Sequence, residues 1–522
     1  MGIYFNPGNI SFRKDVKNEI YVDKTGLLEV LNGKIGSSKN CLSLSHARRF
    51  GKSQAAGMID AYYSRGSDSR ELFSQFEIAM KPDFEEHLNK YNVIHLDISS
   101  FEDFYTDTLI AKIVERLTRE LREEYPDVNY DESINFILAD ISEKSRSPFV
   151  IIIDEWDCII RNHSECPELV HEYLQFLHSL FKSEESKRYL ALGYITGILP
   201  IKKIDDESAL NNFQEFTMLD SKQLTPYFGF TEGEVQALCE QFNMEFESVK
   251  KWYDGYRISG QHMYNPNSVY EAMTAHKMAS YWKNTSHFGT INKYITLNFD
   301  GLKESVLDML TGGSVPVDVN QFQNDLSQIN SRDDALTALI HLGYLAYDEE
   351  RGTAFIPNYE VSTAFQAALS TGNWKEIART ISRCEELLWA TIDGKTDRVA
   401  ELVELAHEAY TSVLKYNDEN SLSCAITMAY FTAPAYYNVI RELPSGKGFA
   451  DIALIPRADS GGKPAMILEL KWDSTADTAI RQIKERRYTG ALAGYGSEIL
   501  LVGISYNKDG DKRHDCLIEK FE

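Results

Sequence analysis

The sequence predicts an α/β protein in which a parallel sheet covered by helices precedes a second, C-terminal α/β domain. Within residues 41–197, apolar runs of strand length alternate with helical patterns, which is typical of a parallel sheet between helices. The first of these strands leads directly into Gly-Lys-Ser and then a helix, the order that a phosphate-binding loop requires. Near the C-terminal end, a polar turn joins two apolar strands that carry isolated charged residues.

Length and composition favour a multidomain globular protein. The chain has 522 residues, of which 43% are hydrophobic and 12% aromatic, and a length of about 150 residues per domain suggests about three domains. No apolar run approaches the ~20 residues that span a membrane, and the N-terminus lacks the basic and apolar regions of a signal peptide. Seven widely spaced cysteines argue against a zinc cluster or a disulfide framework. We therefore expect a cytoplasmic protein with no membrane contact.

The net charge of −24 limits how the chain could meet nucleic acid. A uniformly acidic surface would repel DNA and RNA, so any contact has to be local. Two basic clusters could provide it, namely Arg48 and Arg49 with Lys52, and the stretch from Arg481 to Arg487. From charge alone, the second cluster is better explained as the solvated face of a helix.

Strands and helices are expected to alternate through the first 200 residues. Asp23 and Thr25 are expected to cap a helix that follows them. A run of β-branched residues over 150–153 is typical of a strand buried on both faces. The expected helices cover residues 26–31, 54–63, 106–124, 131–145 and 167–183, and the expected strands cover residues 41–44, 91–98, 149–153 and 188–197.

The stretch from Ser45 to Ser53 is a candidate phosphate-binding loop. Backbone N–H groups and the N-terminus of the following helix would attract phosphate oxygens. Lys52 would reach the β- and γ-phosphates, and the Ser53 hydroxyl would bind Mg²⁺. The full pattern is G-x-x-x-x-G-K-S, and His46 stands where its first glycine is expected. The rest of the chain must therefore decide whether this is a nucleotide site.

Polar residues at two later strand ends support a nucleotide site. In open α/β sheets ligands bind beyond the carboxyl ends of the strands, where Asp154, Glu155 and Thr196 are expected. Asp154 would hold Mg²⁺, and Glu155 would act as general base toward the attacking water. Thr196, on a strand between the other two, would sense the γ-phosphate or orient that water. The alternative is that Asp154 and Glu155 only form a polar strand end.

The region after the first sheet is expected to be mainly helical over residues 206–300. Thr231 and Glu234 form a capping-box pattern at the start of one helix. Arg257 follows an aromatic turn and could approach a nucleotide, either in its own subunit or from a neighbouring one. The alternative for Arg257 is a surface position at an aromatic structural corner.

A domain boundary is expected over residues 311–317, which contain two adjacent glycines. An amphipathic helix over 333–342 and a hairpin over 343–358 then suggest a small winged-helix-like module. Such modules bind DNA or simply pack, and the acidic neighbours Glu349 and Glu350 favour packing. Residues 360–410 are expected to form a helical connector.

The C-terminal hairpin contains the second chemical pattern. Asp451 lies on its first strand, and Glu469 and Lys471 share one face of its second strand because side chains alternate along a strand. Burying such charges unpaired is costly, so they need each other or a metal ion. The alternatives are therefore a structural Asp–Lys–Glu ion-pair network and a metal site in which Asp451 and Glu469 supply the oxygen ligands that Mg²⁺ prefers.

Four motifs together resemble the bacterial family of AAA-like predicted ATPases that carry a C-terminal nuclease-like domain. They are Tyr21-Val22-Asp23-Lys24-Thr25, Arg48-Arg49-Phe50-Gly51-Lys52-Ser53, Asp154-Glu155-Trp156-Asp157 and Thr196-Gly197-Ile198. Members of that family commonly have Arg-Pro where this chain has His46-Ala47, so the missing glycine is a family trait. The resemblance implies that Arg49 and Gly51 contribute to the nucleotide site together with Lys52 and Ser53.

The C-terminal hairpin resembles the PD-(D/E)XK nuclease superfamily, whose pattern is Asp followed by Glu-x-Lys. The resemblance implies that Asp451 and Glu469 bind a metal ion that lowers the pKa of a bound water, and that Lys471 orients this water or stabilises the developing charge. Superfamily members often add a helical glutamate before the first strand and a glutamine after the second, and Glu419 and Gln482 match these places.

Glu442 is a weaker rival for the helical carboxylate of that pattern. The resemblance also changes the interpretation of the second basic cluster, since Arg481, Arg486 and Arg487 could contact the phosphate backbone beside the metal.

The resemblance implies a four-part organisation and a coupled function. We expect an AAA-like P-loop ATPase core over 1–205, a helical lid over 206–310, a winged-helix-like part and helical connector over 311–410, and a PD-(D/E)XK nuclease-like domain over 411–522.

The expected cofactors are ATP and Mg²⁺ or Mn²⁺, and DNA is the expected partner. A homo-oligomer would suit AAA-type sites, which often lie between subunits. By analogy, the pairing suits bacterial defence or mobile-element biology. The alternative is a nucleotide-dependent switch whose nuclease-like domain is inactive.

Overall fold

The computed structural model describes most of the chain, in two compact units. One unit comprises Met1–Trp282 with Pro316–Val361, and the other comprises Lys283–Val315 with Ser362–Glu522. The four-part division expected from the sequence stays a prediction. The described residues are 2–102, 108–201, 210–281, 287–297, 299, 301–310, 312–323, 326, 329–369, 375–411, 422–423, 426–427, 429–430, 433, 436–445, 448–456, 463–492, 498–507 and 513–521.

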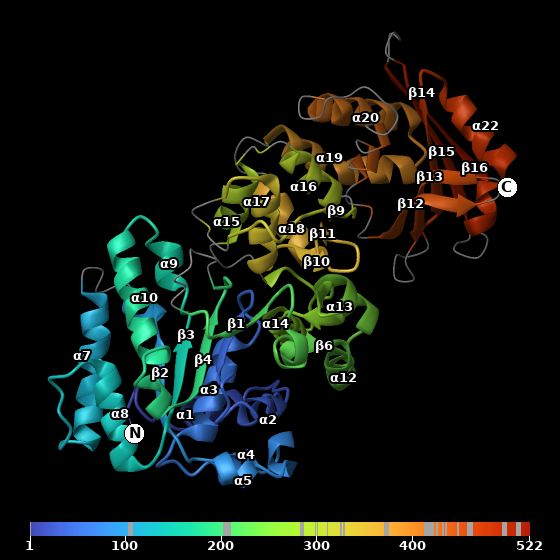
Figure 1. Ribbon diagram of the computed structural model, residues 1–522. Helices are drawn as coiled ribbons and strands as arrows, with labels where there is room; N and C mark the ends of the chain where they lie inside the picture. The colour runs from blue at the N-terminus through green and yellow to red at the C-terminus, as the bar shows by residue number, and fades with distance from the viewer. Residues whose placement is uncertain are drawn as a thin grey trace. The chain divides into compact units, whose positions relative to one another are not determined.

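The first unit is built on a five-stranded sheet with the order β2-β3-β4-β1-β5, in which all neighbouring strands are parallel (Figure 1). The four expected strands are present, and β5 adds a fifth that the sequence did not indicate. Because β4 lies between β1 and β3, the expected place of Thr196 between the other two strand ends is confirmed. The strands are β1 (Cys41–Ser45), β2 (Asn92–Asp97), β3 (Phe149–Asp154), β4 (Leu190–Gly197) and β5 (Gln214–Thr217).

Helices cover both faces of this sheet, as the buried run of β3 predicts. The helices are α1 (Ile10–Asp15), α2 (Gly26–Asn32), α3 (Lys52–Tyr63), α4 (Arg70–Phe73), α5 (Phe84–His87), α6 (Ser99–Glu102), α7 (Leu109–Glu124), α8 (Ile134–Ser145), α9 (Cys158–Asn162), α10 (Pro167–Phe181) and α11 (Ser186–Tyr189), with a 3₁₀ helix η1 (Glu77–Met80). Helices α7, α8 and α10 lie on one side and α2 and α3 on the other (Figure 1). In β3, Ile151 and Ile153 pack into the first layer, while Val150 and Ile152 pack into the second.

The capping role expected for Asp23 and Thr25 is wrong in detail. No side-chain hydrogen bond caps α2 at Thr25. Asp23 instead accepts the N–H of Thr25 and the N–H of Glu77, both at 2.8 Å. Thr25 Oγ1 accepts the N–H of Ile78 at 3.2 Å. The two side chains therefore hold η1 against the N-terminal segment, a long-range role that the local sequence could not indicate.

The region expected to be mainly helical contains helices and a small sheet. The helices are η2 (Lys222–Tyr227), α12 (Glu232–Phe242), α13 (Phe246–Tyr253) and α14 (Pro266–Ala275), and the antiparallel strands, in the order β6-β8-β7, are β6 (Phe230–Thr231), β7 (Tyr256–Ile258) and β8 (Gln261–Tyr264). The capping box between Thr231 and Glu234 is confirmed. Glu234 also forms a salt bridge with Lys24 at 2.7 Å, which joins α12 to the N-terminal segment.

The helix and the hairpin expected after residue 332 are both present, and the winged-helix-like module stays a prediction. They are α17 (Arg332–His341) and the antiparallel hairpin of β10 (Ala346–Asp348) and β11 (Thr353–Phe355), with β9 (Val315–Pro316) as a third strand. Helix α18 (Tyr359–Leu369) follows.

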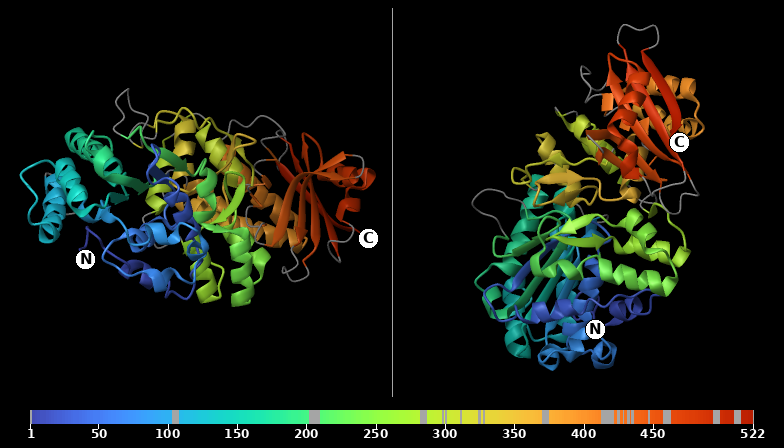
Figure 2. Two further views of the ribbon diagram at one scale, coloured as in Figure 1. Left: turned by 60° about the horizontal axis from the view of Figure 1, so that its bottom comes forward. Right: turned by 90° about the vertical axis from the view of Figure 1, so that its right-hand side faces the viewer.

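The second unit is built on a mixed five-stranded sheet in chain order, β12 to β16, with the β14–β15 pair parallel and the other pairs antiparallel (Figure 2). Ile480 and Ile483 of α22 pack against Ile467 and Leu501 of the sheet. The elements are α15 (His287–Ile295), α16 (Leu302–Leu310), α19 (Lys375–Ile392), α20 (Thr396–Thr411), β12 (Tyr437–Ser445), β13 (Gly448–Pro456), β14 (Ala465–Trp472), α22 (Ala476–Arg486), a 3₁₀ helix η5 (Tyr488–Leu492), β15 (Ile499–Tyr506) and β16 (His514–Phe521).

None of the helices in the described part of the chain combines the length and the apolar character that crossing a membrane requires.

The turn before β7 gives a test of this packing. Gly255 has φ of +110°, and a Cβ there would lie 1.8 Å from the carbonyl oxygen of Pro357. Gly260 has φ of +76° but no atom within 4 Å of an added Cβ. We expect Gly255→Ala to lower the free energy of unfolding by about 3 kcal/mol or more, and Gly260→Ala by about 1 kcal/mol, because only the first adds a steric clash to the backbone strain. Chemical denaturation of both variants measures the difference, and equal losses would contradict the packing described.

Candidate functional site

The loop between β1 and α3 is held by glycine geometry and one aromatic anchor. Gly51 caps α3 with φ of +88°, and Arg49 also has a positive φ of 69°. Phe50 is fully buried and packs edge-on against Tyr256, with ring centroids 5.2 Å apart. Its carbonyl accepts the N–H of Gly229 at 3.1 Å. The loop therefore depends on contacts with β7 and the segment before β6, as well as on its own sequence.

His46, at the place of the missing glycine, is a buried structural residue. Its Nε2 is hydrogen-bonded to Ser221 Oγ, and its backbone N–H donates to the carbonyl of Gly197 at 3.1 Å. Burial lowers the pKa of His46 to about 3, so the ring is neutral at ordinary pH. Because Ser221 Oγ already donates to the Thr217 carbonyl, we infer that His46 Nε2 carries the proton. The imidazole thus fixes the loop to the segment after β5.

Lys52 begins α3 and is buried, with 5% of its surface exposed. Its ammonium donates to the carbonyls of His46 and Ala47 at 2.8 and 3.0 Å. Burial lowers the pKa of Lys52, and the nearby carboxylates of Glu155 and Asp154 oppose this effect. Among the described residues, no side-chain hydrogen bond caps the N-terminus of α3. The first N–H groups of the helix and the Lys52 ammonium therefore suit an anion at this end of the helix.

Asp154 and Thr196 meet at the carboxyl ends of β3 and β4. The Thr196 hydroxyl donates to Asp154 Oδ1, and both residues are buried. The carbonyl of Thr196 accepts the N–H of Trp156 at 2.8 Å. The structure thus brings the two predicted residues together, with Thr196 in contact with the predicted metal ligand.

Glu155 lies in a buried charge cluster that the motifs did not reveal. Its backbone is left-handed, with φ of 51°. Its carboxylate accepts from Arg161 at 3.0 Å, and Arg161 also pairs with Asp157 at 2.8 Å. Burial raises the pKa of Glu155, and the charge of Lys52 opposes that rise. Arg161 could not be found from sequence because no motif includes it, although it follows the acidic strand end by only a few residues.

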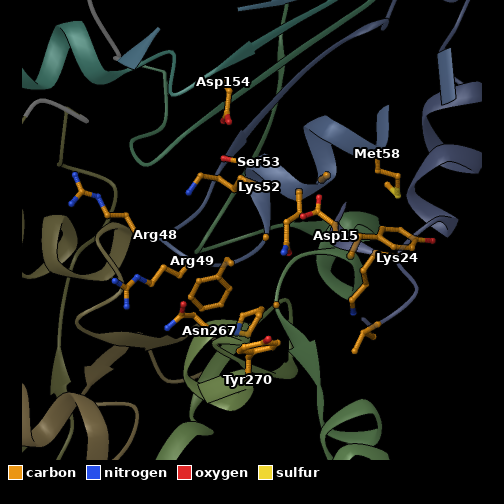
Figure 3. A pocket seen from close by; sticks show the side chains of 18 of the residues that line it. Asp15, Lys24, Arg48, Arg49, Lys52, Ser53, Met58, Asp154, Asn267 and Tyr270 are labelled. Atoms are coloured by element: carbon orange, nitrogen blue, oxygen red, sulfur yellow. The ribbon is translucent and has the colours of Figure 1, made fainter. Parts of the chain in front are cut away.

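These residues line a cavity of about 770 Å³ within the first unit. Lys52, Ser53, Asp154 and Glu155 form part of its wall. Figure 3 shows Arg48 and Arg49 on one side of it and Asp15, Lys24 and Met58 on the other. Its further walls include Ile20, Tyr21 and Val22, before α2, and Pro266, Asn267 and Tyr270 of α14. The sequence marked Tyr21 and Val22 only as part of a motif, since the contribution of both segments depends on how the chain closes around the loop.

Arg49 and Arg257 have different surroundings. Arg49 lines the cavity and donates to the Tyr281 carbonyl at 3.3 Å. Arg257 forms a salt bridge with Asp348 at 3.2 Å and is not among the residues that line this cavity. Its surroundings fit the alternative of a surface arginine at a structural corner.

The C-terminal hairpin brings four predicted residues together. Ile452 of β13 pairs with Leu468 of β14, so the same register places Asp451 opposite Glu469. Asp451 Oδ2 accepts the N–H of Leu470 at 2.7 Å. Lys471 Nζ donates to Glu469 Oε1 at 3.0 Å, and Gln482 of α22 donates to the same oxygen.

The second oxygen of Glu469 suits a cation ligand. Glu469 is 1% exposed, and its Oε2 is buried without a hydrogen-bond partner in the described part of the chain. Burial, together with the charge of Asp451, raises the pKa of Glu469 to about 7. A buried acceptor beside a second carboxylate is the donor set that Mg²⁺ or Mn²⁺ takes.

The predicted third carboxylate is not placed. Glu419 lies outside the described residues. Glu442 is exposed and lies on strand β12 rather than on a helix. Among the described residues, no group of three or more His, Cys, Asp or Glu side chains is arranged to hold a metal.

Arg481, Arg486 and Arg487, the basic residues at α22, have different surroundings. Arg481 pairs with Asp477 at 3.2 Å on the exposed helix face. Arg486 donates to Tyr488 at 3.2 Å, and a Cβ on Gly448 would lie 3.0 Å from its Nη1. Arg486 therefore lies beside the start of β13, three residues before Asp451. Arg487 ends α22 in the left-handed conformation.

Comparisons with known proteins identify both parts of the chain. Residues 10–205 match the family described as predicted AAA-ATPases, and residues 417–515 match the PD-(D/E)XK nuclease superfamily. The chain therefore combines an AAA-ATPase-like domain with a PD-(D/E)XK nuclease-superfamily domain, and the fold class predicted from sequence is confirmed.

Individual relatives are more distant. The chain is 22% identical over 523 residues to a protein of Azotobacter chroococcum mcd 1 that is described as an uncharacterized protein in the vnfD 5′ region, and the match covers 94% of this chain and 93% of that protein. The ORC2 protein of Aeropyrum pernix, in ADPNP–ADP complexes, is 12% identical and matches over 70% of this chain and 100% of its own chain. Its TM-score of 0.31 describes only a loose likeness.

The raised pKa of Glu469 predicts how metal affinity depends on pH. Glu469 must lose a proton to bind a cation, so with a pKa of about 7 affinity should rise about tenfold per pH unit below pH 7 and level off above it. An ordinary glutamate, which is fully ionised by about pH 6, would give a metal affinity that stays constant from about pH 6 upward. Calorimetry with Mn²⁺ between pH 5.5 and 8.5 measures this, in a chain carrying Asp154→Asn to remove the other candidate ligand. Glu469→Gln should bind weakly and without this dependence, and a flat profile for the parent chain would contradict the prediction.

Proposed function

We propose that this protein is an ATP-hydrolysing enzyme whose ATPase core controls a Mg²⁺- or Mn²⁺-dependent DNA nuclease domain. The observation that carries the proposal is the convergence of Lys52, Ser53, Asp154 and Glu155 on one cavity at the carboxyl edge of a parallel sheet. The predicted division into 1–205, 206–310, 311–410 and 411–522 is part of this proposal, as are a cytoplasmic location, a homo-oligomeric state and a role in bacterial defence or mobile-element biology.

The ATPase residues divide the work of phosphate binding and hydrolysis. Lys52 would exchange its bonds to two backbone carbonyls for bonds to the β- and γ-phosphates, and Gly51 leaves room for the phosphates to approach the backbone. Ser53 and Asp154 would hold Mg²⁺, which neutralises phosphate charge when bound. Thr196 orients Asp154 through its hydroxyl, and Glu155 would take the proton of the attacking water.

The hairpin residues suit phosphodiester hydrolysis. Asp451 and Glu469 would bind the cation, which lowers the pKa of a coordinated water and offsets the charge of the scissile phosphate. Lys471 and Gln482 hold Glu469 through its other oxygen, so its Oε2 would be available to the cation. Lys471 would also orient the water or stabilise the developing charge. Glu419 is proposed as a further ligand on the family pattern alone.

Removing the Lys52 ammonium tests the nucleotide site. We expect Lys52→Ala to weaken binding of a fluorescent ATP analogue by about 100-fold or more, because this ammonium is the main positive charge proposed to bind the β- and γ-phosphates. Lys187→Ala is the matched control, since Lys187 is exposed and pairs only with Glu184 among the described contacts. Thermal melting would confirm that both variants are folded. Unchanged ATP affinity in folded Lys52→Ala would contradict the phosphate-loop assignment.

Cleavage of supercoiled plasmid tests the nuclease site. With Mg²⁺ or Mn²⁺ we expect the wild-type protein to cut DNA. The cleavage rate of Lys471→Ala should be lower by at least about 100-fold. The cleavage rate of Lys484→Ala should be close to that of the wild type. Lys484 pairs with Glu519 on the exposed side of α22. Assays with and without ATP, and with RNA in place of DNA, show whether nucleotide controls cleavage and which nucleic acid is cut. A folded wild-type chain that binds ATP but cuts neither would favour the nucleotide-dependent switch.

A further inference from the structure

Arg161 lies directly beside the proposed general base, although no ATPase motif includes it. It belongs to α9, which follows the acidic end of β3. Its Nη2 donates to Glu155 Oε2 at 3.0 Å, and its Nε donates to Asp157 Oδ2 at 2.8 Å. The side chain of Arg161 is 8% exposed and that of Asp157 is 1% exposed. The pair between them is therefore almost fully removed from water.

Asp157 connects this guanidinium to the neighbouring strand. The same Oδ2 accepts the N–H groups of Ile198 and Leu199 at 3.2 and 2.9 Å. These two residues come directly after β4, where Thr196 lies. Packing here is close, because a Cβ on Gly197 would lie 2.7 Å from Asp157 Oδ1. One carboxylate thus fixes both Arg161 and the backbone just beyond Thr196.

A guanidinium held in this way forms a fixed support. Moving it would leave the buried Asp157 carboxylate without its cation, which is strongly destabilising. Glu155 has a left-handed backbone, so it leaves β3 in a direction set by its local turn. Lys52 and Arg161 both place positive charge near its carboxylate, and Arg161 donates a hydrogen bond to it. Arg161 takes Oε2 and leaves Oε1 to accept a proton. The planar fork of arginine suits this double contact, which a lysine ammonium could not reproduce.

We propose that Arg161 is a positioning residue for ATP hydrolysis, which holds Glu155 toward the attacking water and aligns it, through Asp157, with Thr196 on β4. This inference rests on the proposed ATPase function. In the step concerned, the water oxygen forms a bond to the γ-phosphorus and its proton passes to Glu155. The bond from the γ-phosphorus to the β–γ bridging oxygen breaks, and ADP leaves with the electron pair. Arg161 also lines the cavity, but its guanidinium donates to Glu155 and Asp157, so we assign it a role through Glu155 rather than on the nucleotide.

Turnover and affinity measured separately test this role. We expect Arg161→Gln to lower kcat for ATP by about 10- to 100-fold, part of the 10²- to 10⁴-fold that a positioned base contributes, while the Kd for ATP changes by less than about threefold. Arg188→Gln is the matched control and should keep both values, since Arg188 is 62% exposed and pairs with Glu143 at the surface. If Arg161→Gln does not fold, Arg161→Lys takes its place as the test variant. The lysine keeps the buried positive charge but cannot hold both carboxylates, so kcat of this variant should also fall.

A double-mutant cycle separates positioning from general stability. Because Arg161 acts through Glu155, Glu155→Gln with Arg161→Gln should be about as slow as Glu155→Gln alone. If the decrease in kcat of the double variant equals the product of the decreases in the two single variants, the inference is overturned. A loss of ATP affinity of tenfold or more with unchanged kcat would also overturn it, since Arg161 would then bind phosphate directly.

The same experiment separates the role of Arg161 from the proposed ATP hydrolysis. If the wild type hydrolyses ATP, Lys52→Ala does not, and Arg161→Gln keeps a normal kcat, then only the role of Arg161 is overturned. A wild-type chain that binds ATP without hydrolysing it would overturn the proposed hydrolysis, and the inference on Arg161 with it.

Discussion

The parallel pairing of β1, β4 and β3 is the constraint on which the first site depends. Parallel strands end at the same edge of the sheet, so the loop after β1 and the polar residues after β3 and β4 meet there. The edge is also where buried charges have to balance. Lys52 is held by backbone carbonyls and lies near the carboxylates of Asp154, at the end of β3, and Glu155. Arg161 pairs with Glu155 and Asp157. Cations and carboxylates therefore stabilise one another around a cavity that can accept an anion.

The second site uses the same physical logic on a different scaffold. An antiparallel hairpin places Asp451 opposite Glu469, and α22 brings Gln482 to the same carboxylate. Both sites hold a carboxylate in place by engaging one of its oxygens and leaving the other available. Arg161 does this for Glu155, and Lys471 with Gln482 does it for Glu469. In each case, the energetic cost of burying charge is offset by a neighbour that also directs the oxygen for which we propose a chemical role.

Periodicity and motif order in the sequence were sufficient for most elements of the fold. The apolar runs located β1 to β4, and the alternation of charged and apolar residues located β13 and β14. These signals are local, because they depend on which face of a strand or helix each side chain occupies. Strands β5 to β9, β12, β15 and β16 are not among the elements expected from the sequence. The local sequence predicts a capping role for Asp23 and Thr25, whereas in the structure they hold a 3₁₀ helix that is distant in sequence.

The sequence by itself determined the two families of domain and the residue types of both sites, because Gly-Lys-Ser, Asp-Glu and Asp…Glu-x-Lys are short patterns with a chemical requirement behind each. Only the tertiary structure decided how those residues are held. His46 is a neutral ring fixed by Ser221, the cavity is completed by α14 and the segment before α2, and Glu155 is tied to β4 through Arg161 and Asp157. Such contacts join residues from different elements, so their energy depends on the packed chain and leaves no periodic trace in the sequence.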